Sequence, residues 1–356
     1  MRVALVGPPQ SGKSTLFSAV AAIGGSHVDV SRADQPHLAV VKVSDPRLDL
    51  LAEHYQSRKT THAELEFLDL PGLDLRDEAG RHRARSHWAA MRQSDMLAFV
   101  VRAFEDPAMP AYRDRVDPSA DVSELLDEML FADLDQVTSR IGKLQAAVKK
   151  PTGDRAEQER ELELMRRLAE MLENERPISK AVATEAEDKM IRSFAFLSQK
   201  PVLVAVNCGE GALEADVPRE PGGRTTLALS AKIEQEISEL DPPERGKFLA
   251  DLGLEAPAGE RMVRACYEAL DLVSFLTVVS GECRAWTVRA GTPAVEAAGA
   301  IHGDMARGFI RAETVAFDDY QAAGDMKSAR AAGKIRLEGK SYIVRDGDII
   351  NFRFNV

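Results

Sequence analysis

The segment from residue 7 to residue 15 has the residue types and spacing of a phosphate-binding loop. It matches the pattern GxxxxGKS in full and consists of Gly7, Pro8, Pro9, Gln10, Ser11, Gly12, Lys13, Ser14 and Thr15. Its two glycines let the backbone curl so that successive N–H groups face one anion. The lysine can reach the β- and γ-phosphates, and the Ser14 hydroxyl can ligate Mg²⁺. We therefore expect a nucleoside triphosphate site here, with the whole segment as its cradle.

A second motif, Asp69-Leu70-Pro71-Gly72, follows the apolar stretch 64–68. An aspartate at the end of a parallel strand near the phosphate loop is the usual neighbour of a phosphate-bound magnesium ion. We expect Asp69 to join Ser14 at the metal and the Gly72 N–H to sense the γ-phosphate. Asp-x-x-Gly is common by itself, so a plain strand-to-loop turn is the alternative interpretation.

A third motif, Asn207-Cys208-Gly209-Glu210, follows the apolar stretch 202–206. A guanine-binding protein usually has Asn-Lys-x-Asp here, but Cys208 replaces the lysine and Glu210 replaces the aspartate. Asn207 can pair with N6 and N7 of adenine, or it can form an Asx turn that closes the strand. The loop that backs the base is matched further on by Ser230, Ala231 and Lys232. We predict ATP as the ligand, with GTP as the alternative.

Apolar stretches of strand length precede these motifs. They cover residues 2–6, 38–43, 64–68, 96–101, 201–206 and 227–230. Runs of this kind are typical of strands buried in a parallel sheet. Together with a helix expected at 14–22, they predict an α/β fold, with a P-loop NTPase domain built on a mostly parallel sheet.

A long charged segment, 112–193, interrupts that domain. Apolar residues recur at steps of three and four over 121–149, which predicts an amphipathic helix. Pro151-Thr152-Gly153 breaks the pattern, and a second helical stretch follows at 155–174. We expect these two helices to form an antiparallel coiled-coil hairpin.

The sequence pattern changes from helical to strand-like after residue 271. Strand-like segments are expected at 275–279, 285–288, 311–316, 341–344 and 349–354, with a helix at 293–300. Strands around one short helix predict a small β-grasp domain at the carboxyl end.

Composition limits the possible settings. The 356 residues carry a formal net charge of -11, which disfavours a protein that coats DNA nonspecifically, although residues 282–356 are nearly balanced with eleven basic against ten acidic side chains. No run of about eighteen apolar residues predicts a membrane span. The three cysteines lack CxxC spacing, so neither a disulfide framework nor a zinc site is indicated. We expect a cytoplasmic protein without a membrane or specific DNA partner.

Longer strings add a family resemblance. The phosphate loop, the Asp-x-x-Gly motif, the Asn-x-x-Glu motif and the helical insertion resemble the YchF/Obg-like ATPase family, as do Ala285-Trp286-Thr287-Val288-Arg289, the string GAIHGDMARGFIRAETVAFDDY and the ending DGDIINFRFNV. The resemblance implies a nucleotide-binding domain at 1–111 and 194–272, a hairpin at 112–193 and a TGS-type β-grasp domain at 273–356. It also implies adenine preference and contact with the ribosome or RNA through the TGS domain and the hairpin.

Several positions depart from that family's pattern. Ala33 stands where the family has a first-switch Thr, and Ala111-Tyr112 stands where it has a His credited with hydrolysis. Leu73 agrees with the family, although Ras-like enzymes place a water-orienting Gln there. We therefore expect a switch protein with slow hydrolysis and an unidentified catalytic residue. The rival is a nucleotide-gated binding module without meaningful hydrolysis, and a P-loop small-molecule kinase is disfavoured because no substrate lid is visible.

A basic cluster follows the Asp-x-x-Gly motif. It comprises Arg81, Arg83, Arg85 and Arg92, with His82 and His87 among them. One interpretation is a solvated helix that faces a partner. The other is an arginine finger in cis that stabilises charge on the phosphates.

Overall fold

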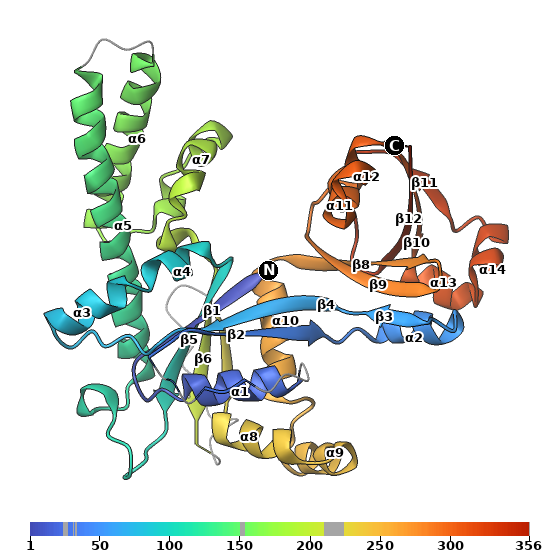
Figure 1. The fold of residues 1–356 in the computed structure, drawn as a ribbon, viewed down its shortest axis with the longest axis horizontal. Coiled ribbons are helices and arrows are strands. Elements are labelled where there is room, and N and C mark those ends of the chain that lie inside the picture. Colours follow the sequence, from blue (N-terminus) through green and yellow to red (C-terminus); the bar gives the residue numbers. More distant parts are fainter. Residues whose placement is uncertain (24–27, 31, 33, 150–153, 210–223, 356) are drawn as a thin grey trace. The chain divides into compact units, whose positions relative to one another are not determined.

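The computed structural model describes residues 1–23, 28–30, 32, 34–149, 154–209 and 224–355 (Figure 1). The chain divides into two compact units. The first is built from residues 1–22, 27–39 and 67–258, and the second mainly from residues 40–66 and 259–356. None of the helices in the described part is long and apolar enough to cross a membrane.

A six-stranded sheet carries the three sequence motifs. Its order is β2-β4-β1-β5-β6-β7, with β1 at Arg2–Val6, β2 at His37–Val43, β4 at Ala63–Asp69, β5 at Met96–Ala103, β6 at Val202–Cys208 and β7 at Thr225–Leu229. Strands β1, β5, β6 and β7 pair in parallel, as predicted. All residues of β5 except the last are buried, since helices cover both faces of such a sheet. The carboxyl ends of the parallel strands, and the loops that follow them, meet at one edge.

Short helices connect or follow these strands. They are α1 at Lys13–Ile23, α3 at Glu78–Arg85, α4 at Trp88–Gln93, α8 at Ala231–Glu239 and α9 at Pro242–Asp251. Capping side chains set where several of them begin. Asp77, for example, accepts a hydrogen bond from the Gly80 N–H at 2.7 Å and starts α3. Residues 74–85, which follow the Asp-x-x-Gly motif and are called the second switch below, therefore end in a helix.

The inserted segment is a helical hairpin, as predicted. Helix α5 runs over Pro118–Val148 and α6 over Arg155–Glu173, and they lie side by side (Figure 1). The segment ends in a shorter helix, α7, at Glu185–Ile191. The first half of α5 packs on the sheet through Val122, Leu125 and Met129, whereas its second half packs on α6. One helix thus belongs to both the nucleotide-binding core and the hairpin.

A buried ion pair fastens α5 to the nucleotide-binding core. Asp133 has no exposed surface and accepts a hydrogen bond from Arg92 Nη1 at 2.8 Å. It also accepts from the backbone N–H groups of Leu197 and Ser198 at 3.0 and 2.8 Å. Arg92 is therefore committed to a structural role and is not available as an arginine finger.

A second six-stranded sheet lies in the second unit. Its order is β11-β10-β12-β8-β9-β3, with β3 at Lys59–Thr61, β8 at Leu272–Val279, β9 at Glu282–Arg289, β10 at Phe309–Ala316, β11 at Arg336–Glu338 and β12 at Asp348–Phe354. Its helices are α2 at Pro46–His54, α10 at Ala258–Ala269, α11 at Ala294–Ile301, α12 at Gly303–Arg307, α13 at Phe317–Ala323 and α14 at Met326–Ala331. Separate apolar clusters contain α2 and α13 in one case and α11 in the other.

Two details of this sheet differ from the prediction. Residues 341–344 are not a strand, because only Ile343 forms a bridge, to Pro293. The expected strand is replaced by β11, which pairs with β10. The sheet also takes β3 from the amino-terminal part of the chain, in parallel with β9. The sequence Lys-Thr-Thr has no apolar alternation, so its strand conformation depends on the partner edge.

Candidate nucleotide-binding site

The phosphate loop has the left-handed backbone that its glycines predict. Gly12 has a φ of 83°, and Gln10 just before it has a φ of 62°. A Cβ on Gly12 would lie 2.0 Å from Asn207 Nδ2, and a Cβ on Gly7 would lie 2.2 Å from the Val100 carbonyl oxygen. A larger residue at Gly7 would need a backbone shift, and one at Gly12 would displace the Asn207 amide and strain the backbone. The loop leads into α1 at Lys13, so the helix N-terminus faces the same point.

Lys13, Ser14 and Asp69 meet beside this loop. Lys13 Nζ lies 2.5 Å from Asp69 Oδ1, and Ser14 Oγ donates to Asp69 Oδ2 at 2.8 Å. Lys13 is 5% exposed and Asp69 2%, so the ion pair is buried. The structure therefore brings together the three side chains that the sequence assigned to phosphate and metal.

The donor set at this position suits magnesium. Among the described residues there is no group of three or more His, Cys, Asp or Glu side chains that could hold a metal ion. Mg²⁺ characteristically takes one or two protein oxygens and completes its shell with water and substrate phosphates. Asp69 and Ser14 supply one carboxylate and one hydroxyl for such a site.

Two buried polar atoms nearby have no hydrogen-bond partner. One is Ser11 Oγ, in a residue only 2% exposed, and the other is Nδ1 of His37. His37 Nδ1 lies 4.0 Å from Asp69 Oδ2. Because buried polar groups are nearly always paired in native structures, two such atoms beside the phosphate loop indicate room for a polar ligand. His37 has no motif spacing, and only the position of β2 beside β4 brings it to the site.

The loop after Asp69 lies against the phosphate loop. A Cβ on Gly72 would come within 2.9 Å of Pro9 Cα, which explains the glycine. The Leu73 N–H donates to the Gly7 carbonyl oxygen at 2.9 Å. The Leu73 side chain is 1% exposed and packs in the apolar core, so it cannot orient a water molecule.

Asn207 connects the phosphate loop to the loop after β7. Its Nδ2 donates to the Ser11 carbonyl oxygen at 3.0 Å, and its Oδ1 accepts from the Ala231 N–H at 2.9 Å. A primary amide keeps one further hydrogen and one further lone pair after these two bonds. Ser230 caps α8 through the Ile233 N–H. The predicted base-binding residues Asn207, Ser230 and Ala231 are thus brought together around the phosphate loop.

Three further residues were predicted to contribute to the base-binding site, namely Cys208, Lys232 and Glu210. Cys208 is buried, and burial raises the pKa of its thiol, so it stays protonated near neutral pH. Lys232 lies in the first turn of α8. Glu210, like Ala33 of the first switch, lies outside the described residues.

One histidine of the basic cluster is electrostatically linked to the site. Burial and the positive charge of Lys13 both lower the pKa of His87, which favours the neutral imidazole. Two other cluster members contact acidic residues of α5. Arg92 is bound to Asp133, and Arg81 Nε lies 3.7 Å from Glu128 Oε2 on α5.

This geometry defines the class of protein, a P-loop nucleotide-binding protein of the GTPase type with an inserted helical hairpin. Sequence profiles agree with that class. Residues 2–134 match the family described as "50S ribosome-binding GTPase". Residues 272–355 match the carboxyl-terminal family of YchF GTPases, described as "Protein of unknown function (DUF933)".

Similarity to individual proteins covers the whole chain. The chain is 36% identical to "Ribosome-binding ATPase YchF" of Bacillus subtilis and 38% identical to that of Haemophilus influenzae, in both cases over 99% of this chain and 98% of the relative. It is 32% identical to "Obg-like ATPase 1" of Oryza sativa subsp. japonica, over 100% of this chain and 92% of the relative. The solved YchF GTPase of Schizosaccharomyces pombe superposes with a TM-score of 0.83 at 27% identity, covering 99% and 97% of the two chains. The chain belongs to the YchF family.

Proposed function

We propose that this chain is a nucleotide-binding switch protein that binds ATP with Mg²⁺, hydrolyses it slowly and associates with the ribosome. The observation that carries the proposal is the buried cluster of Lys13, Ser14 and Asp69 at the mouth of a complete phosphate loop. The names of the relatives, which describe ribosome-binding ATPases, support the same function. A ribosomal partner also agrees with the cytoplasmic location expected from the sequence.

The residues around the loop have distinct proposed roles. Backbone N–H groups of residues 7–15 hold the phosphates, and Lys13 leaves Asp69 to contact the β- and γ-phosphates. Ser14 and Asp69 would hold Mg²⁺ through their side-chain oxygens. When bound, Mg²⁺ neutralises charge on the phosphate oxygens. The Gly72 N–H then contacts the γ-phosphate, so the loop after it differs between the ATP and ADP states.

The base is proposed to lie beside Asn207, Cys208 and the 230–232 loop. The spare hydrogen and lone pair of the Asn207 amide match N7 and N6 of adenine. Glu210 is proposed to complete the pocket. ATP should therefore bind at least as well as GTP, and a tenfold preference for GTP in titration calorimetry would refute the adenine assignment. The double substitution Cys208→Lys with Glu210→Asp should move preference toward GTP.

Slow hydrolysis follows from what the site lacks. Leu73 is packed in the core, and the Tyr112 hydroxyl is bonded to the Leu75 N–H at 3.0 Å. Neither can orient the attacking water, and a missing stabilising group of the arginine-finger kind lowers turnover by about 10³–10⁵. Steady-state phosphate release, with single Ala substitutions at Arg81, Arg83 and Arg85, tests this point. A rate of order one per second that survives all three substitutions would show that a catalytic group has been overlooked.

The rival function is nucleotide-gated binding without meaningful hydrolysis. It shares the phosphate and base site and differs only in turnover. Single-turnover decay of bound ATP, with and without ribosomes, separates the two functions. Decay that ribosomes accelerate supports the slow ATPase, and ATP that stays intact in both samples supports the rival.

The ribosome contact is proposed to lie on the carboxyl-terminal, TGS-type domain and the hairpin. Arg311 and Arg353 are exposed and stand opposite each other on β10 and β12, and this strip also contains Glu313, which is ion-paired with Arg353. Deleting the domain would remove β9, the partner of β3, so point variants are the cleaner test. Arg311→Glu should weaken co-sedimentation with ribosomes at moderate salt, whereas the exposed control Lys327→Glu should not. Equal loss in both variants would argue against this strip.

A further inference from the structure

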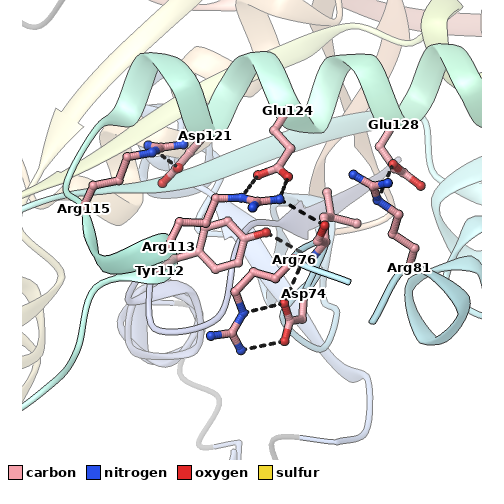
Figure 2. A network of polar contacts seen from close by, with 10 residues as sticks. Asp74, Arg76, Arg81, Tyr112, Arg113, Arg115, Asp121, Glu124 and Glu128 are labelled. Atoms are coloured by element: carbon pink, nitrogen blue, oxygen red, sulfur yellow. Dashed lines mark hydrogen bonds and ion pairs between the residues drawn. The ribbon is translucent and has the colours of Figure 1, made fainter. Parts of the chain in front are cut away.

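Both backbone polar groups of Leu75, in the second switch after the Asp-x-x-Gly motif, are bonded to the turn that precedes α5. The Leu73 and Leu75 side chains also pack in one apolar cluster with residues of α5. The Leu75 N–H donates to Tyr112 Oη at 3.0 Å, and the Leu75 carbonyl oxygen accepts from Arg113 Nη2 at 3.1 Å (Figure 2). Leu75 lies three residues after Gly72, and Leu73 between them is bonded to the Gly7 carbonyl oxygen. The switch loop therefore runs directly from the phosphate loop to this clamp.

The same clamp is attached to helix α5. Arg113 Nε lies 3.2 Å from Glu124 Oε2, and Arg113 Nη2 bonds the other carboxylate oxygen of Glu124 (Figure 2). A two-point contact between a guanidinium and a carboxylate fixes both distance and orientation. Arg113 Nη2 thus bonds both the Leu75 carbonyl oxygen and Glu124, and Arg113 Nε bonds Glu124 as well.

The turn that carries the clamp is strained. Arg113 and Asp114 have φ values of 54° and 53°, a left-handed backbone that residues other than glycine seldom adopt. Such positions persist only where the surroundings hold them. Here the Arg113 guanidinium is bonded to both Leu75 and Glu124. Tyr112 is only 6% exposed, and its ring lies beneath the guanidinium groups of Arg76 and Arg113.

We propose that Tyr112 and Arg113 transmit the γ-phosphate state of the switch loop to hairpin helix α5. Both backbone polar groups of Leu75 are bonded to the clamp, so a shift of the loop must either break two hydrogen bonds or move the turn at 112–114. A move of that turn passes to α5 through Glu124, and α5 extends to Val148 at the far end of the hairpin. The inference rests on the proposed function, because it requires Gly72 to respond to the γ-phosphate.

A neighbouring contact provides a matched control. Arg115 belongs to the same turn, and its Nη1 lies 3.0 Å from Asp121 Oδ1 on α5 (Figure 2). Its side chain also reaches the Asp117 carbonyl oxygen. It therefore helps to anchor the turn to the helix without touching Leu75. If the clamp were only a structural support, loss of Arg115 and loss of Arg113 would have similar effects.

The test measures hairpin position in the full-length chain. Spin labels on Gln145→Cys in α5 and Glu236→Cys in α8 report the distance between the hairpin and the nucleotide-binding core. Both positions are exposed, while the three native cysteines are buried. Pulsed dipolar spectroscopy is run with Mg²⁺ and either ADP or AMPPNP, and calorimetry measures the affinity for each nucleotide.

The expected result is a distance distribution that differs between ADP and AMPPNP in the parent protein. Tyr112→Phe and Arg113→Met should abolish the difference and leave ADP affinity unchanged. Glu124→Gln should abolish it as well, because the loop stays clamped but its tie to α5 is weakened. Arg115→Met should retain the difference. If Arg113→Met unfolds the chain, Arg113→Lys keeps the charge and removes the two-point contact.

Three outcomes would overturn the inference. Binding of both nucleotides without a distance difference in the parent protein would refute the inference and leave the proposed function intact. A difference that persists in Arg113→Met and Glu124→Gln would also refute the inference alone. Absence of AMPPNP binding would refute the proposed function and, with it, this inference.

Discussion

The buried ion pair between Lys13 and Asp69 predicts effects on stability and on nucleotide binding that a double variant can separate. Lys13 Nζ lies 2.5 Å from Asp69 Oδ1, and both residues are nearly inaccessible. Replacing one partner leaves a buried charge without compensation, which costs about 3–5 kcal/mol. Because Ser14 Oγ still donates to Asp69 Oδ2, we expect Lys13→Met to lie at the lower end, about 3 kcal/mol.

The double variant separates the pair from the ligand. In Lys13→Met with Asp69→Asn neither charge remains, so most of the lost stability should return. ATP affinity should not return, because the lysine contact with the phosphates contributes about 1.5–3 kcal/mol, or roughly ten- to hundredfold in affinity. Asp69→Asn alone frees Lys13 from its partner. It should bind ATP in EDTA at least as tightly as the parent protein and lose the gain from Mg²⁺.

Urea denaturation and titration calorimetry measure the two quantities. Lys189→Met is the control for removing a lysine, because its partner Glu185 is exposed and such i,i+4 pairs contribute only about 0.3–0.5 kcal/mol. The reasoning would be refuted if both single variants were as stable as this control. It would also be refuted if the double variant bound ATP as tightly as the parent protein, since Lys13 would then have no part in phosphate binding.

Three further predictions concern the surroundings of the site. His37→Ala should weaken the Mg²⁺ dependence of ATP binding, because the unpaired Nδ1 of His37 lies 4.0 Å from Asp69 Oδ2. Electron paramagnetic resonance spectra of the Mn²⁺ complex are the readout, and unaltered spectra would contradict this prediction. Arg92→Met should lower the free energy of unfolding by about 3–5 kcal/mol through the fully buried Asp133, and an unchanged urea midpoint would contradict it. Complete burial raises the pKa of the Cys266 thiol to about 12. The folded chain therefore keeps this proton at a pH where the unfolded chain has lost it. The free energy of unfolding should consequently fall as pH rises from about 9 to about 12. Cys266→Ala should flatten that decline in alkaline urea titrations, and an equal slope in both proteins would contradict the assignment.

Local sequence was sufficient for the elements whose signals are continuous along the chain. The phosphate loop was predictable because its glycines, lysine and serine lie within one short stretch of the chain and need no distant partner to be recognised. The parallel strands and the hairpin were predictable because buried runs and steps of three and four need no knowledge of the partner. The proposed catalytic deficit also starts from sequence, because Leu73 has no polar group wherever it lies.

Tertiary structure decided what depends on neighbours distant in the chain. Strand β3 and its place beside β9 could not be predicted, since Lys-Thr-Thr has no apolar alternation and pairs only because an open edge is present. The approach of His37 to Asp69 and the clamp on Leu75 likewise depend on chain crossings, not on spacing. Hydrogen bonds and ion pairs act over about 3 Å, and a sequence specifies such distances only within one helix, strand or turn. The side chains proposed to carry phosphate chemistry were therefore determined locally, whereas those proposed to connect this chemistry to the hairpin were decided by the fold.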